Sequence, residues 1–180
     1  MHDRGVSSVI ATVLLVAVVV LVAAVVSATA FGFTADLREP GPTVAESSGR
    51  LVADVSGSND QIVRLTHEAG DPIPVDEIEI VVRACGSQGR LVNLPASDGD
   101  PRPTGDYVAG DDLFDNSYNS VSGPIGEDGR TVDGRWTAGE TATFRIVNSA
   151  CSLAPGDTAT VRVVHTPTGS VVIEEELTAS

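Results

Sequence analysis

One stretch of this sequence constrains its fold more than any other: no charged residue occurs from Gly5 to Ala35. About 20 apolar residues are enough to cross the hydrocarbon core of a bilayer as a helix. From Val9 to Val26 only Thr12 interrupts the apolar run, and a threonine hydroxyl can bond a backbone carbonyl one turn earlier. Because lipid offers the backbone no water, the segment must satisfy its own hydrogen bonds there. We therefore predict a hydrophobic helix over residues 6–35.

Such a segment has three alternative fates. A secretory signal peptide would use His2 and Arg4 as its basic start and Ala28-Thr29-Ala30 as its cleavage site, although its apolar region would be unusually long. An uncleaved anchor would keep Arg4 on the cytoplasmic side and the acidic bulk of the chain outside. A prepilin-type (class III) signal would be cut before the apolar helix, and the helix would survive in the mature protein.

The residues at the start of the apolar run favour the third fate. Residues 4–11 read Arg-Gly-Val-Ser-Ser-Val-Ile-Ala and lead directly into the helix, which resembles the N-terminus of archaeal type IV pilins. Ser8 and Ala11 stand where that family usually has Pro and Gly. The resemblance implies that residues 1–5 are a class III signal peptide and that prepilin peptidase cuts after Gly5. The cleavage residues are then Arg4, Gly5 and Val6, with Val6 as the mature N-terminus.

The rest of the chain is strongly acidic. The formal net charge is −14, and all 11 basic residues are arginine. This balance argues against nucleic acid or anionic lipid as a partner, because both require a basic face. A dense carboxylate surface without lysine fits a salt-rich exterior that screens charge repulsion, so we expect a halophilic source. Residues 36–49 contain Pro40, Gly41 and Pro42 and are predicted to form a linker.

Residues 50–180 are predicted to form an acidic antiparallel β-sandwich. Short apolar–polar alternations are separated by turn residues such as Pro155-Gly156-Asp157, and no amphipathic helix is evident. Segments 65–73, 136–142 and 161–169 resemble strings found in haloarchaeal pilin-like proteins. That resemblance implies an α+β fold in which a long N-terminal helix carries an immunoglobulin-like β-domain. The predicted strands are residues 51–56, 62–67, 78–83, 90–94, 141–147, 160–164 and 170–177.

Four residues of the β-domain are considered as site residues. Cys85 and Cys151 form a disulfide if the domain lies outside the cell, and otherwise remain two buried free thiols. His67 and His165 each close a predicted strand just before a turn, where a solvated or capping histidine is usual. A metal site would need a further ligand near both histidines, so we predict none.

An aspartate-rich stretch lies between residues 98 and 115. Calcium requires several oxygens that converge on one loop, but the spacing here does not match the EF-hand pattern, so a solvated loop is the better interpretation and calcium binding stays open. No nucleophile elbow, P-loop, HExxH or dinucleotide fingerprint occurs, and we predict neither enzymatic activity nor a cofactor. The aspartates are Asp98, Asp100, Asp106, Asp111, Asp112 and Asp115.

These observations predict a structural subunit of an archaeal type IV pilus-like surface filament, involved in adhesion or cell-surface contact. The subunit would sit in the cell membrane before assembly and then form a homo-oligomeric filament through its N-terminal helix. Small residues allow such helices to approach closely. The alternative is a membrane-anchored or secreted binding module that does not polymerise, and the sequence does not separate a major from a minor pilin. The helix residues expected in the filament core are Val9, Ile10, Val13, Val16, Ala17, Val20 and Ala24.

Overall fold

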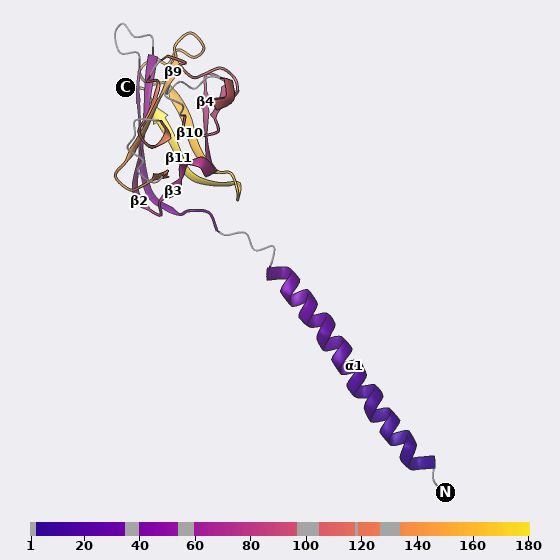
Figure 1. Ribbon diagram of the computed structural model, residues 1–180. Coiled ribbons are helices and arrows are strands. Elements are labelled where there is room, and N and C mark those ends of the chain that lie inside the picture. Colours follow the sequence, from indigo (N-terminus) through magenta and orange to yellow (C-terminus); the bar gives the residue numbers. More distant parts are fainter. Residues whose placement is uncertain (1–2, 35–39, 54–59, 97–104, 118, 127–133) are drawn as a thin grey trace. The chain divides into compact units, whose positions relative to one another are not determined.

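The computed structural model describes residues 3–34, 40–53, 60–96, 105–117, 119–126 and 134–180. The chain divides into two compact units, Met1–Glu39 and Pro40–Ser180 (Figure 1). Among the described residues, the first unit contains the α-helix α1 and the second contains the strands. We call the second unit the β-domain.

Helix α1 spans Asp3–Thr34, which is 32 residues and about 48 Å at 1.5 Å per residue. No proline lies within it, so no backbone donor is lost in its interior. Thr12 Oγ1 donates a hydrogen bond of 2.8 Å to the carbonyl of Val9, as the sequence analysis expected of this hydroxyl. Among the described residues, Val9–Ala28 is the one stretch long and apolar enough to cross a membrane. The predicted hydrophobic helix is therefore confirmed, and it also includes residues 3–5.

The β-domain consists of two larger antiparallel sheets and one small one. In order, the first sheet is β1 (Val44–Val52), β2 (Asp60–Gly70), β9 (Thr141–Val147) and β7 (Val121–Ser122). The second is β11 (Ser170–Thr178), β10 (Thr158–His165), β4 (Ile78–Ala84), β5 (Ser87–Leu91) and β6 (Val108–Gly110). The small sheet pairs β3 (Ile73–Pro74) with β8 (Arg135–Trp136). Three short 3-10 helices complete the described elements: η1 (Val75–Glu77), η2 (Gly105–Tyr107) and η3 (Gly123–Ile125).

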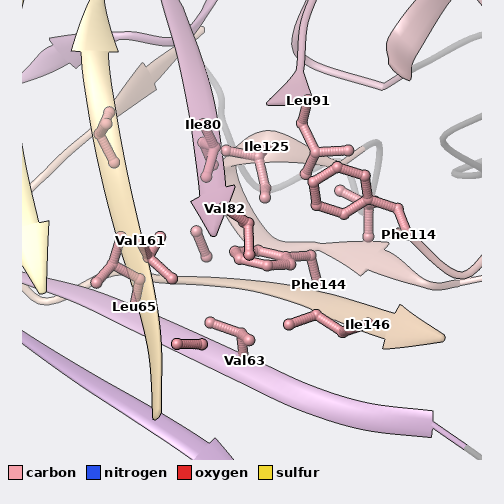
Figure 2. Packing of buried hydrophobic residues seen from close by; sticks show 14 of the residues in the cluster. Val63, Leu65, Ile80, Val82, Leu91, Phe114, Ile125, Phe144, Ile146 and Val161 are labelled. Atoms are coloured by element: carbon pink, nitrogen blue, oxygen red, sulfur yellow. The ribbon is translucent and has the colours of Figure 1, made fainter. Parts of the chain in front are cut away.

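The core lies between the two larger sheets and follows the period of two expected for strands with one buried face. Alternate residues of β4, β9 and β10 are buried, and Figure 2 shows side chains from both sheets meeting around Phe144. The rings of Phe144 and Phe114 pack edge to face, with centroids 5.9 Å apart. Aliphatic residues make up most of this core, as the low aromatic content of the chain requires.

The two sheets come together at one side of the sandwich. Leu51 of β1 and Ala179, just after β11, form a parallel bridge, and the amide of Ser180 donates to the Leu51 carbonyl at 3.2 Å. Ser47 Oγ donates to the Glu175 carboxylate at 2.6 Å, again from β1 to β11. The prediction of an antiparallel sandwich behind an N-terminal helix is confirmed, whereas its immunoglobulin-like character stays a prediction.

The first strand begins earlier than the sequence suggested. We assigned residues 36–49 to a linker, but β1 begins at Val44. The residues that follow Val44 are mostly polar and exposed, so they lack the apolar alternation that would have identified a strand. Backbone pairing with β2, for example Ser48 opposite Thr66, and side-chain hydrogen bonds from Ser47 and Ser48 hold this part. At its other end β1 stops at Val52, whereas the predicted strand covered residues 51–56. Residues 54–59 lie outside the described part of the chain.

A disulfide joins Cys85 and Cys151, whose Cα atoms are 5.6 Å apart. Cys85 and Gly86 form the two-residue turn between β4 and β5, both with positive φ (53° and 79°), which matches the twist of an antiparallel hairpin. Cys151 follows β9, so the bond ties an end of one sheet to an end of the other. A disulfide of this kind is typical of proteins in an oxidising compartment.

Candidate functional site in the apolar helix

The described side chains of α1, from Val9 to Ala28, are exposed on every side of the helix. Leu15 and Leu21 are each 66% exposed, although such side chains are normally buried in a folded domain. The helix residues predicted for a filament core all belong to this surface: Val9, Ile10, Val13, Val16, Ala17, Val20 and Ala24. No described residue of the chain covers them.

The arrangement of these residues suits contact with another apolar helix. Five of them recur at spacings of three and four, which places them along one side of α1. Two of the five are alanines, and small residues allow the backbones of neighbouring helices to approach closely. The remaining sides of α1 are also apolar, so lipid can surround the helix as readily as protein. The five residues are Ile10, Val13, Ala17, Val20 and Ala24.

The residues of the predicted signal cleavage lie at the start of α1. Arg4, Gly5 and Val6 all fall within the helix that begins at Asp3. Glycine offers the closest approach to the backbone of a scissile bond, because it has no Cβ. Cleavage after Gly5 stays a prediction.

The two histidines of the β-domain are buried, so neither is solvated, although His165 does end β10 and contacts Thr168 of the following turn as a capping residue would. His67 is fully buried because β2 continues to Gly70 instead of ending at residue 67. Its Nδ1 lies 3.3 Å from the carbonyl of Trp136, and its ring meets the Trp136 indole edge to face. No described residue contacts its Nε2 with a hydrogen bond. His165 does end β10, but its Nε2 lies 3.1 Å from the Glu77 carboxylate beneath the turn.

The aspartates considered as calcium ligands have separate structural roles where the structure describes them. Asp111 accepts the Gln88 amide at 2.8 Å, and Asp115 accepts the Ser117 amide at 3.1 Å. Asp106 and Asp112 are exposed, and Asp98 and Asp100 lie outside the described residues. Within the described part of the chain, no group of three His, Cys, Asp or Glu side chains is placed to hold a metal ion.

Sequence reasoning missed a polar cluster around His165. Glu77 stands 88 positions earlier in the sequence, so no local motif connects the two residues. Thr168 and Ser170 join the cluster from the turn that follows His165. The turn itself is visible in the sequence from Pro167 and Gly169, but its carboxylate partner is evident only in the fold.

The described part of the chain defines a class of protein: a β-domain with an internal disulfide, preceded by an apolar helix whose described side chains are exposed. Comparison with known families specifies this further. Residues 4–45 match the family model of the archaeal type IV pilin N-terminal domain. This N-terminal region is therefore similar to that of archaeal type IV pilins. The match includes the whole apolar surface and ends as β1 begins. Neither the curated proteins nor the solved structures contain a match to the chain.

Proposed function

We propose that this chain is a structural subunit of an archaeal type IV pilus-like surface filament and that α1 joins its copies. The observation that carries the proposal is the uncovered apolar surface of Val9–Ala28, which lies inside the segment that matches the pilin model. In lipid, 20 residues span about 30 Å and match the hydrocarbon thickness. The helix therefore suits a membrane before assembly and an apolar filament core afterwards.

Assembly in this proposal exchanges lipid contacts for contacts between helices. Lipid chains are as apolar as valine and leucine, so the driving force is close van der Waals contact rather than escape from water. Prepilin peptidase would first remove residues 1–5, so that the mature helix starts at Val6. The β-domain would form the outer surface of the filament, which is where contact with cells or other surfaces takes place.

The rival proposal is a membrane-anchored or secreted binding module that does not polymerise. It uses the same β-domain, but α1 either only anchors the chain or is lost. The family match at residues 4–45 favours the filament, because its basis is the helix and not the β-domain. The two proposals differ in whether a change confined to α1 affects association between copies.

A pair of identical substitutions tests the proposal. Val16 is 59% exposed in α1 and Val171 is 47% exposed on β11, so Val16→Glu and Val171→Glu place the same charge at two exposed valines. A charged residue near the centre of a membrane helix costs about 3 kcal/mol. We expect Val16→Glu to abolish surface filaments, seen by electron microscopy and shearing, and Val171→Glu to leave them.

A second helix variant separates assembly from membrane insertion. Ala17→Leu keeps α1 apolar, so the protein should still fractionate with membranes, while the larger side chain prevents close helix approach at this position. We expect fewer filaments with unchanged membrane content. If both helix variants formed filaments at the level of Val171→Glu, the proposal that α1 joins the copies would be wrong. If the unsubstituted chain itself formed no filaments, the binding module would be favoured.

A further inference from the structure

The chain enters the β-domain through residues 40–43, which we call the neck segment. Two hydrogen bonds join Thr43 to Asp71. The Thr43 amide donates to Asp71 Oδ2 at 3.1 Å, and the Asp71 amide donates to the Thr43 carbonyl at 2.9 Å. Gly41 lies against the turn between β10 and β11. A Cβ atom on Gly41 would lie only 2.8 Å from Ser170 Oγ and 3.0 Å from both His165 Nδ1 and Thr168 Oγ1. Any other residue at position 41 would require these side chains to shift.

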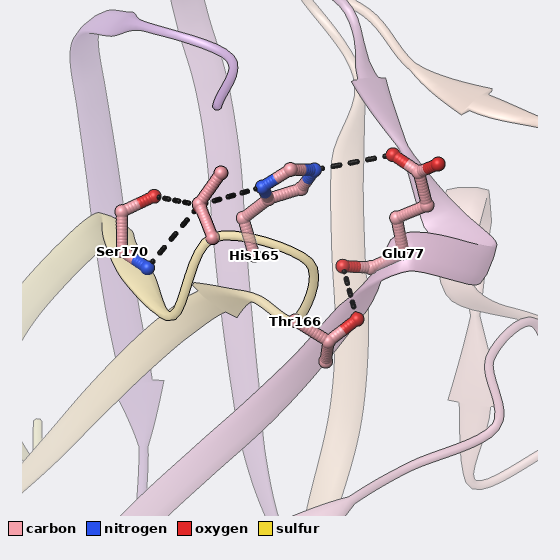
Figure 3. Close-up of polar contacts among 5 residues, drawn as sticks. Glu77, His165, Thr166 and Ser170 are labelled. Carbon is pink, nitrogen blue, oxygen red and sulfur yellow. Dashed lines mark hydrogen bonds and ion pairs between the residues drawn. The ribbon is translucent and has the colours of Figure 1, made fainter. Parts of the chain in front are cut away.

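The surface beneath Gly41 is itself held by hydrogen bonds, several of which appear in Figure 3. His165 Nε2 lies 3.1 Å from Glu77 Oε2, and its Nδ1 lies 2.8 Å from Thr168 Oγ1. Thr168 Oγ1 and Ser170 Oγ are 2.7 Å apart. Thr166 ties the turn to η1 as well, because its amide and its hydroxyl both donate to the Glu77 carbonyl, at 2.8 and 2.9 Å.

The chemistry of the partners assigns the direction of these bonds. A carboxylate only accepts, so His165 Nε2 is the donor to Glu77, and in the neutral form of the ring Nε2 carries the one N–H proton. Nδ1 then accepts from the Thr168 hydroxyl, which in turn accepts from Ser170. The His165 side chain is only 7% exposed, while that of Glu77 is 47% exposed. His165 therefore connects a turn of the second sheet to η1 from a protected position.

We propose that His165 is a positioning residue for the neck segment: with Glu77 and Thr168 it holds the turn on which Gly41 rests. The consequence is that the chain leaves the β-domain at one fixed place. This inference concerns the β-domain alone, and it holds whether α1 lies in a membrane or in a filament. It goes beyond the proposed function, because assembly through α1 does not require a held neck.

Amide hydrogen exchange of the full chain in detergent tests the proposal. The probes are the amides of Thr43 and Asp71, whose hydrogen bonds report whether the neck segment is in place. Thr168→Val keeps the shape of the side chain and removes its hydroxyl. We expect it to speed exchange of both probes at least tenfold, and Thr168→Ser to restore protection. The matched control is Thr158→Val at the exposed other end of β10, which should leave both probes unchanged.

A second pair of variants removes the carboxylate side of the cluster. Glu77→Ala should release the probes as Thr168→Val does, while Glu77→Gln keeps an acceptor for Nε2 and should preserve protection. If Thr168→Val lowers protection throughout the β-domain, it no longer reports on the neck segment alone, and the two Glu77 variants then test the proposal. The proposal is overturned if neither Thr168→Val nor Glu77→Ala changes the probes beyond the Thr158→Val control. Because the readout is an exchange rate in dispersed protein, it stays informative even if no filament forms.

Discussion

Valines in the two units of this protein meet opposite environments. Val16 of α1 is 59% exposed, whereas Val161 of β10 is fully buried. The side chains are the same, so the difference lies in what the rest of the chain provides. In the β-domain a facing sheet covers each apolar row, while in α1 no described residue does so. The β-domain therefore completes its apolar contacts within one chain, and under the proposed function α1 completes them with lipid or other copies.

The largest effect on stability is expected from the core of the β-domain. Phe144 is fully buried between the sheets, so Phe144→Ala should lower the free energy of unfolding by about 4 kcal/mol through lost burial and a cavity. Leu15→Ala removes a comparable apolar group from α1 and should leave this free energy unchanged. Urea unfolding in detergent, followed by fluorescence of the single tryptophan, Trp136, measures both. Equal losses from the two variants would mean that α1 packs against the β-domain.

Removing the disulfide should have the next largest effect, again confined to the β-domain. The bond closes a loop between residues 66 positions apart, for which the chain-entropy relation gives about 4 kcal/mol, and removal of a native disulfide typically costs about 2–5 kcal/mol. We expect the Cys85→Ser/Cys151→Ser variant to lose about 3 kcal/mol in the same unfolding assay. Its membrane association through α1 should not change. A variant as stable as the parent would show that the sheets hold together without the bond.

The sequence predicted those strands correctly that bury one row of apolar side chains, and it missed strands that lack such a row. Strand β9 was predicted with its observed bounds and β4 to within one residue, because each has one buried face and a clear alternation. The start of β1 was missed because its residues around Ser47 and Ser48 are polar and mostly exposed, so no apolar alternation marks the strand. The two-residue strands are too short for any periodicity.

The candidate site shows the same limits. The long run without charged residues identified α1 and its apolar surface directly, because a helix surrounded by lipid or by apolar helices requires such a run. The cluster around His165 was beyond reach, because Glu77 comes to it only through folding. Burial of His67 was also missed, since a polar ring within a strand reads as a surface residue until the strand's full length is known.

A smaller effect is expected at His67. Its side chain makes one hydrogen bond of 3.3 Å, and its buried Nε2 has no partner among the described residues. His67→Leu gives up a weak bond but also removes a buried polar atom, whose burial without a partner costs about 1–3 kcal/mol. We expect the free energy of unfolding to change by no more than about 1 kcal/mol. A much larger loss would show that the ring contributes to the core in a way that its contacts do not indicate.

The smallest effect is expected on the outer face of the second sheet. Arg162 donates to Glu174 Oε1 from Nε at 3.0 Å and from Nη2 at 2.6 Å, with side-chain exposures of 35% and 51%. Exposed pairs of this kind contribute about 0.2–1 kcal/mol and weaken as salt rises. Arg162→Gln should therefore lower stability by about 0.5 kcal/mol at low salt and by less at high salt. A salt-independent loss above 2 kcal/mol would contradict this.

The central claim is that α1 remains in the mature protein and joins its copies, and the mature N-terminus tests it most directly. N-terminal sequencing and intact mass of subunits sheared from the cell surface should give a chain that starts at Val6 and retains the whole apolar surface. A surface protein that starts at Phe31 would have lost α1, and one that starts at Met1 or His2 would be an uncleaved anchor. Either of these results would contradict the account.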